Sequence, residues 1–166
     1  ISAAIRGCQQ CWEVTFNKLI AFNVTNLGCT RMLLIDLDVA AFGNFDKVFE
    51  SLPTGMVKWG NMHNSGVVLL RPDDDMFRKM LEALVKRAEY GESATLFWPP
   101  KGTTKENAQE VGDQGFLNAF LTGGIGGDLQ AIHELNSSFN FRSANLDSGR
   151  DAMGHIVSPE EIKLVH

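Results

Sequence analysis

Several residue types that mark particular classes of protein are scarce in this sequence. Among 166 residues there are three cysteines and one tyrosine, and Asp and Glu (20) outnumber Lys and Arg (15). Three cysteines are too few for a disulfide framework. The formal net charge of −5 disfavours a nucleic acid as the main partner. No apolar run approaches the roughly 18 residues of a membrane span, so we expect no such span in this segment.

Two of the cysteines, Cys8 and Cys11, have C-x-x-C spacing, but there is no second pair and no nearby histidine. A structural zinc site needs four ligands, so we favour two thiols on one helical face over a metal or redox site. The remaining composition, 44% hydrophobic and 21% charged, is that of a globular protein. The length suits a single domain over residues 1–166. Because the sequence opens on Ile1 without an initiator Met, we expect a fragment or a processed product.

Helix-like and strand-like patterns alternate along the chain, which predicts the α/β class. Apolar residues at helical spacing indicate helices, and short continuous apolar runs indicate strands buried on both faces, as in parallel sheets. We interpret the acid run Asp73–Asp75 as the first turn of a helix, where acids favour the helix dipole. The expected elements are helices at 10–27, 73–88 and 113–121, a short helix from Asp46, and strands at 32–35, 67–70, 129–135 and 162–166, with loops at 51–55, 90–112 and 122–128.

Asp36 and Asp38 follow the apolar run at 32–35 and are separated by one leucine. Side chains two positions apart in a strand project to the same side, so we expect both carboxylates in one crevice at the strand's carboxyl end. Neighbouring carboxylates repel unless a positive group lies between them. Magnesium and manganese are held by one or two carboxylates plus substrate phosphates. The motif by itself equally fits aspartates that cap a helix or form salt bridges.

His166 ends another short apolar run, "IKLVH", which places a polar group at a strand terminus. A mixed site of Asp and His ligands is chemically reasonable for manganese. The other histidines, His63, His133 and His155, have no strand context. We therefore add His166 to the two aspartates as a third candidate metal ligand.

Three blocks of the sequence, in this order, resemble the glycogenin-like retaining glycosyltransferases. The blocks are "KLIAFNVTNLGCTRMLLIDLDVAAFGNFDKVFE", "NSGVVLLRP" and "GDQGFLNAF". That family includes glycogenin, galactinol synthase and plant xylan glucuronosyltransferases. The resemblance implies the GT-A fold, a mixed and mostly parallel sheet flanked by helices. It also implies transfer of a hexosyl or uronosyl group from a UDP-sugar to a saccharide, polyol or protein acceptor.

The resemblance further implies roles for individual residues. Asp36, Asp38 and His166 would hold manganese, which grips the diphosphate of the donor. Asp113 and Gln114, in "GDQG", would be the catalytic pair that contacts the transferred sugar near the reacting carbon. The implied donor-binding residues are Lys18, Asp36, Leu37, Asp38, Asn64, Ser65 and Gly66. Judged from the residues alone, Asp113 also fits the N-cap of the next helix, and Asn64-Ser65-Gly66 also fits a turn before a strand.

Two alternative functions stay open at this point. The family's uridine-binding segment before "FNKL" and its Lys-Pro-Trp after the histidine are absent from this sequence, so we expect an incomplete nucleotide site. A truncated, non-catalytic binding domain is therefore one alternative. The other is a phosphatase of the haloacid dehalogenase type, which also places D-x-D after an apolar strand. That type has a second, distal pair of acids, and Asp73-Asp74 could mimic this pair. A homodimer, and a cytoplasmic location in preference to the Golgi lumen, are further hypotheses.

Overall fold

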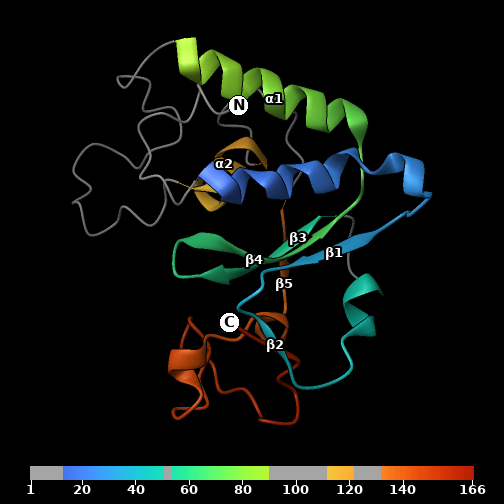
Figure 1. Cartoon of the computed structure of the whole chain (residues 1–166). Coiled ribbons are helices and arrows are strands. Elements are labelled where there is room, and N and C mark those ends of the chain that lie inside the picture. Colours follow the sequence, from blue (N-terminus) through green and yellow to red (C-terminus); the bar gives the residue numbers. More distant parts are fainter. Residues whose placement is uncertain (1–12, 51–53, 90–111, 122–131) are drawn as a thin grey trace. The chain divides into compact units, whose positions relative to one another are not determined.

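The computed structural model describes residues 13–50, 54–89, 112–121 and 132–166 (Figure 1). The chain divides into two compact units. The helical unit comprises Ile1–Thr30 and Pro72–Ala131, and the sheet unit comprises Arg31–Arg71 and Ile132–His166. The prediction of a single domain stays a prediction. Cys8 and Cys11, nearly all of the expected 90–112 loop and the expected 122–128 loop lie outside the described residues.

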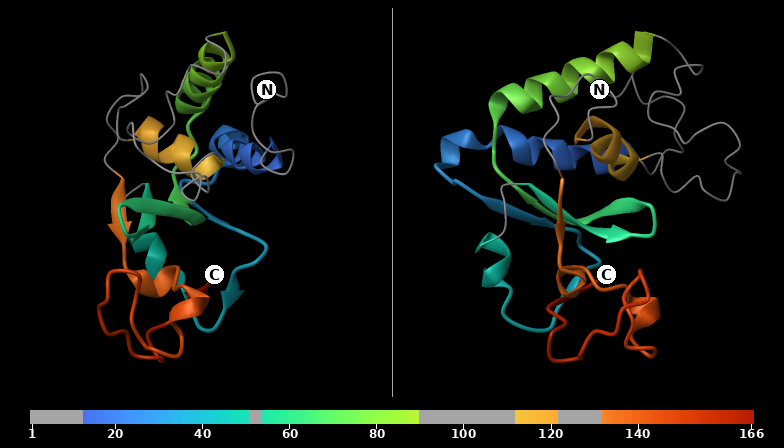
Figure 2. Two further views of the ribbon diagram at one scale, coloured as in Figure 1. Left: turned by 90° about the vertical axis from the view of Figure 1, so that its left-hand side faces the viewer. Right: turned by 180° about the vertical axis from the view of Figure 1, so that it is seen from behind.

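In its described residues the helical unit contains two 3₁₀ helices and two α-helices. The helix expected at 10–27 is described from Glu13 onward and is a pair of 3₁₀ helices; the other two expected helices are α-helical. Figure 1 and both views of Figure 2 show η2 and α1 running side by side, and η2 also contacts α2. The elements are η2 (Glu13–Asn23), η3 (Thr25–Leu27), α1 (Asp74–Glu89) and α2 (Asp113–Leu121).

The 3₁₀ geometry of η2 decides which of its apolar residues are buried. A 3₁₀ helix has three residues per turn, so positions i and i+3 lie on one face. Phe16, Leu19 and Phe22 follow this spacing and are all buried. Ile20, which the α-helical period places on the apolar face, is 53% exposed instead. The Phe16 ring packs against Phe116 of α2, with 6.0 Å between ring centroids.

The acid run before α1 acts at the start of that helix, as predicted. Asp73 Oδ1 accepts a hydrogen bond from the Met76 N–H at 2.9 Å, which is an N-cap contact. Asp75 pairs with Lys79 at 3.2 Å along the helix surface. The apolar stripe of α1 is buried at Met76, Met80 and Leu84, whereas Val85 is half exposed.

The sheet unit holds a mixed four-stranded sheet and a separate two-stranded sheet. In the larger sheet the order is β1-β4-β3-β5; its β1–β4 and β4–β3 pairs are antiparallel, and its β3–β5 pair is parallel (Figure 1). The smaller sheet is the antiparallel pair β2–β6. The strands are β1 (Met32–Ile35), β2 (Ala40–Ala41), β3 (Gly55–Trp59), β4 (Met62–Leu70), β5 (His133–Leu135) and β6 (Leu164–Val165). Short 3₁₀ helices are η4 (Asp46–Glu50), η6 (Ser137–Phe139) and η7 (Ser143–Asn145).

Two clusters of buried apolar side chains stabilise the sheet unit. The first contains Val48, Val57, Leu69 and Leu135 and joins η4 to the four-stranded sheet. The second contains Phe141, Val157, Ile162 and Val165 and holds the C-terminal segment to β6. Full burial of one such side chain contributes about 1.5–3 kcal/mol, so the clusters fix the strand ends that carry the candidate site.

Several predictions for the strands are wrong. β1 is an edge strand that is only half-buried, because it pairs with β4 on one side. Asn64-Ser65-Gly66 lies inside β4 and does not form a turn before it. The four-stranded sheet is mainly antiparallel because β3 and β4 form a hairpin across Gly60, whose φ of +63° suits glycine. His63 and His133, for which no strand context was seen, lie in β4 and at the start of β5, and β5 falls within the strand expected at 129–135.

Among the described residues, no helix is both long enough and apolar enough to cross a membrane.

Candidate metal and donor site

Asp36 and Asp38 lie where β1 gives way to a turn. β1 ends at Ile35, and the Val39 N–H donates to the Asp36 carbonyl oxygen at 3.1 Å. The prediction that both aspartates project from one extended strand is therefore wrong, since it is the turn that brings their carboxylates together. Leu37, between them, is fully exposed.

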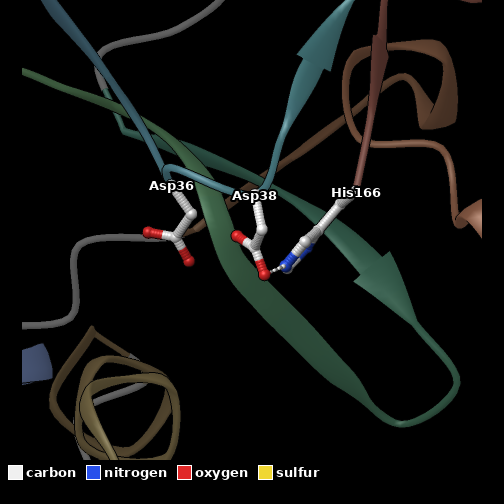
Figure 3. Close-up of side chains that lie close together, drawn as sticks. All are labelled: Asp36, Asp38 and His166. Carbon is white, nitrogen blue, oxygen red and sulfur yellow. Dashed lines mark ion pairs between the residues drawn. The ribbon is translucent and has the colours of Figure 1, made fainter.

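The β2–β6 ladder brings His166 to the aspartates. Ala40 pairs with Val165, and Ala41 with Leu164, so the next position sets His166 opposite Val39. Its Nε2 atom lies 3.4 Å from Asp38 Oδ2, and Figure 3 shows the two side chains facing one another. A histidine distant in sequence from the D-x-D motif thus joins it through strand register.

Asp36, Asp38 and His166 form a candidate cation site. Each offers one ligand atom, and these atoms all lie within 4.8 Å of one another (Figure 3). The side chain of His166 is 19% exposed and that of Asp38 is 75% exposed, so the group is open to solvent at Asp38. Two carboxylates and an imidazole suit a divalent cation, and the open side leaves room for phosphate oxygens as further ligands. Within the described part of the chain it is the one group of this kind.

Asn64 and Gly66 of β4 pack directly against His166. Asn64 Oδ1 lies 3.2 Å from His166 Nδ1, and the Gly66 carbonyl oxygen accepts the Asp36 N–H at 2.8 Å. A Cβ atom on Gly66 would lie only 2.4 Å from His166 Nδ1. Glycine inside a strand often marks such a close approach, and here it lies beside the register shift at Met56/Val57.

Two residues near His166 were missed by sequence reasoning. The Trp59 ring lies 5.4 Å from the His166 ring between centroids, and its indole N–H donates to the Asn140 carbonyl oxygen at 3.0 Å. Asn140 is fully buried and donates through Nδ2 to Asn64 Oδ1 at 2.7 Å. For Trp59 the one clue in the sequence is the neighbouring Gly60, since glycine is typical of hairpin turns. Nothing in the sequence connects Asn140 to this group.

Lys18 and Asp113 form a buried ion pair in the helical unit. Lys18 Nζ lies 2.9 Å from Asp113 Oδ2, with the side chains 16% and 4% exposed. Asp113 is the first residue of α2, where a negative charge also favours the helix dipole. The prediction that this helix begins at Asp113 is confirmed. Gln114 follows in the same turn, and its carbonyl oxygen accepts a hydrogen bond from Asn118 Nδ2 at 2.8 Å.

The structure therefore gathers the candidate residues in two groups. Lys18, Asp113 and Gln114 belong to the helical unit. The sheet-unit group consists of the three candidate ligands with Asn64 and Gly66, while Ser65 is buried in β4 beside them and Leu37 points into solvent.

Comparison with known proteins shows which proteins the chain is similar to in sequence and in fold. No protein-family profile matches the chain. Glycogenin-1 of Caenorhabditis elegans is 25% identical over 130 residues, which cover 76% of this chain and 25% of that protein. The crystal structure of the galactosyltransferase LgtC with donor and acceptor sugar analogues has a TM-score of 0.52 at 17% identity, covering 92% of this chain and 57% of that one. The chain has the GT-A glycosyltransferase fold.

The resemblance inferred from the three sequence blocks is thereby confirmed, as is the GT-A fold with its mixed sheet, whereas the mostly parallel arrangement expected for that sheet is wrong. The apo structure of mouse xyloside xylosyltransferase 1 also matches, with a TM-score of 0.47 and 14% identity over 92% of this chain and 62% of that one. This glycosyltransferase-fold chain spans about a quarter of the length of glycogenin-1 and about three-fifths of each solved chain. In this setting the Asp-Asp-His group is compatible with metal binding.

Proposed function

We propose that the chain belongs to a retaining glycosyltransferase that uses manganese and a UDP-sugar donor. The observation that carries the proposal is the Asp36–Asp38–His166 group in a chain of glycosyltransferase fold. The transferred group would be a hexosyl or uronosyl residue. The acceptor would be a saccharide, a polyol or a protein.

The donor set of this group fits manganese. Carboxylate oxygens suit the ion, and an imidazole nitrogen is an acceptable third ligand. Asp38 is largely exposed, which leaves its side of the group accessible to a diphosphate. When bound there, manganese supplies positive charge for the diphosphate as the sugar–phosphate bond breaks.

The backbone holds the ligands before any donor arrives. The backbone N–H of Asp36 donates a hydrogen bond to the Gly66 carbonyl oxygen at 2.8 Å. The backbone N–H of His166 donates one to the Phe141 carbonyl oxygen at 2.9 Å. Groups that are already in position do not need to reorganise during the reaction. We infer that these hydrogen bonds orient the ligand side chains toward the donor diphosphate.

Asp113 and Gln114 are proposed to contact the transferred sugar. A carboxylate near the reacting carbon stabilises an oxocarbenium-like centre, either by its charge or as a nucleophile. Lys18 pairs with Asp113 at 2.9 Å and balances its charge in buried surroundings. Lys18 would therefore orient the carboxylate, beyond the donor contact that the resemblance implies for it.

Release of UDP tests this function. UDP-glucose, UDP-galactose and UDP-glucuronate are each incubated with the protein and Mn²⁺, with and without sugar acceptors. We expect Mn²⁺-dependent release from at least one donor, lowered about 100-fold in Asp113→Asn, because an electrostatic contact to the transition state is lost. Asp147→Asn, which changes an exposed aspartate, is the matched control.

The same assay separates the alternative functions. Hydrolysis of a phosphate ester with Mg²⁺, with no release of UDP, supports the phosphatase. Mn²⁺-dependent UDP binding without turnover of any donor supports the non-catalytic binding domain. Either result contradicts the proposed transferase activity.

A further inference from the structure

The two ring nitrogens of His166 face different partners. Nε2 lies 3.4 Å from Asp38 Oδ2, on the side of the candidate ligands. Nδ1 lies 3.2 Å from Asn64 Oδ1, on the side of β4. In a neutral imidazole one nitrogen carries hydrogen and the other offers a lone pair, so the partner of Nδ1 determines what Nε2 can do.

The atom of Asn64 that faces His166 is an oxygen. The Gly66 backbone N–H approaches the same atom at 2.8 Å, and a backbone N–H can only donate. Asn140 Nδ2 also donates to this atom, at 2.7 Å. An amide NH₂ group in that position would meet two donors with no lone pair to offer. Asn64 Oδ1 is therefore an acceptor, with its orientation fixed from two directions.

An acceptor beside Nδ1 requires hydrogen on Nδ1. A bare Nδ1 would set its lone pair against the lone pairs of Asn64 Oδ1 at 3.2 Å, which is unfavourable. With the hydrogen on Nδ1, the neutral ring directs the Nε2 lone pair toward Asp38. A histidine that binds a metal typically donates its other N–H to a carbonyl or carboxylate oxygen in this way.

We propose that Asn64 is a positioning residue that fixes the Nδ1–H tautomer and the ring orientation of His166, so that Nε2 can act as a metal ligand. This inference rests on the proposed metal site, and it gives the Asn64 side chain a task other than the donor-sugar contact implied by the family resemblance. The arrangement is built into the unit, because Asn64 is 7% exposed and Asn140 is fully buried. Trp59 packs against the imidazole ring, at 5.4 Å between centroids.

The tautomer can be observed without any metal. Long-range ¹H–¹⁵N correlation spectra of the metal-free protein, with ¹⁵N-labelled histidine, distinguish a protonated from an unprotonated ring nitrogen. The spectra are recorded at alkaline pH, at which a histidine ring is ordinarily neutral. His166→Gln identifies the His166 signals. We expect Nδ1 protonated and Nε2 unprotonated in the wild type, and an Nε2–H ring would overturn the proposal whatever the variants do.

Two substitutions separate positioning from simple packing. Asn64→Leu keeps a similar volume but removes the acceptor, whereas Asn64→Asp keeps an oxygen beside Nδ1. We expect the Leu variant to lose the Nδ1–H preference and to weaken Mn²⁺ binding about 10–100-fold. We expect the Asp variant to keep the Nδ1–H tautomer and to bind Mn²⁺ within a few-fold of the wild type. An unchanged tautomer in the Leu variant, or its loss in the Asp variant, contradicts the role.

The inference and the proposed function fail in different ways. If no UDP-sugar is turned over but His166 has the Nδ1–H tautomer and the Mn²⁺ affinities follow the order above, the function is wrong and the positioning role holds. If UDP-sugars are turned over but His166 is Nε2–H, the positioning role alone is wrong.

Discussion

Gly66 is the residue at which the candidate site has least room. A Cβ atom there would lie 2.4 Å from His166 Nδ1 and 2.8 Å from Asn64 Oδ1. Both distances are shorter than any ordinary non-bonded contact, so a side chain at this position must displace the imidazole ring.

We expect Gly66→Ala to weaken Mn²⁺ binding by about tenfold or more, because a displaced ring no longer directs Nε2 toward Asp38. Titration of Mn²⁺, followed by the electron paramagnetic resonance of the free ion, measures this affinity. Circular dichroism checks that the variant is folded.

A double-variant cycle provides the control for this prediction. In a His166→Ala background the ring is absent, so adding Gly66→Ala should cause no further loss of Mn²⁺ affinity. A loss of equal size in both backgrounds would show that Gly66 acts on some other part of the fold.

At the scale of single residues the sequence predicts the candidate ligands but not the contacts that hold them in place. Asp36, Asp38 and His166 stand out because each follows a short apolar run. The contacts of Asn64 with Asn140 and His166 join positions 76 and 102 residues apart. The β3–β4 pair also has a register shift next to Asn64, for which the sequence shows no sign.

Among the helices, the Lys18–Asp113 ion pair ties η2 to the first turn of α2. Asp113 also donates its N–H to Thr15 Oγ1 at 3.3 Å, which is a second contact between the two helices. The Asp113 carboxylate is almost fully buried and lies 2.9 Å from the lysine Nζ. Removing one partner of a buried ion pair costs much more than replacing both.

We expect Lys18→Met to lower the free energy of unfolding by about 3 kcal/mol, because it leaves the Asp113 carboxylate buried without its partner. The double variant Lys18→Met/Asp113→Asn should recover a large part of that loss. Urea denaturation followed by circular dichroism measures both values. A double variant that is less stable than the single one would contradict this account of the pair.

The segment after η7 is organised around Asp151. Burial raises the pKa of its carboxyl, but hydrogen bonds from the His155 N–H, the Ser137 hydroxyl and the Met153 N–H outweigh burial and hold the pKa below its ordinary value of 3.8. The Met153 and His155 N–H groups lie 2.9 and 2.8 Å from Asp151 Oδ1. One carboxylate thus satisfies several backbone donors of this segment.

The lowered pKa of Asp151 predicts a pH dependence. Since the folded pKa lies below the unfolded one, the stabilisation is complete above the unfolded value and is lost as the pH falls through the folded value. We expect Asp151→Asn to lower the free energy of unfolding by about 1–2 kcal/mol at pH 7. The decrease in the variant's free energy of unfolding below about pH 4 should also be shallower than the decrease in the wild type. Urea denaturation at several pH values checks this, and an unchanged acid slope would contradict it.

The positions of several helices and strands were predictable from the sequence, but the type of helix and the pairing of the strands were less predictable. α1 and α2 have aspartates at their first turns and apolar stripes, and both features are visible in the local sequence. η2 has an apolar pattern that fits an α-helix as well as a 3₁₀ helix, and only the burial of Phe16, Leu19 and Phe22 distinguishes them. β3 was not predicted, because "SLPTG" is typical of a loop and overlaps the start of this strand. Without β3, the antiparallel β3–β4 hairpin could not be predicted either.

At the scale of the whole molecule, the candidate functional residues divide between the two units. The proposed metal ligands lie in the sheet unit, and the Lys18–Asp113 pair lies in the helical unit. The sequence blocks predicted the glycosyltransferase fold because each is local. The division into units was not predictable, because each unit combines segments that are distant in sequence.

This division predicts that metal binding and turnover respond to different substitutions. We expect Asp113→Asn to leave Mn²⁺ affinity, measured without donor, within about twofold of the wild type, because the substitution lies outside the proposed ligand set. UDP release should fall in the same variant. A parallel loss of Mn²⁺ affinity would mean that Asp113 is part of the metal site or that the variant is misfolded, which circular dichroism distinguishes.

The most direct test of the central claim is a calorimetric titration of UDP with and without Mn²⁺. The wild type, Asp38→Asn and the control Asp147→Asn are compared at one pH and salt concentration. We predict that Mn²⁺ strengthens UDP binding at least about tenfold in the wild type and the control, and that Asp38→Asn abolishes this difference. UDP binding that is independent of Mn²⁺ and unchanged in Asp38→Asn would contradict the assignment of Asp36, Asp38 and His166 as the manganese–diphosphate site.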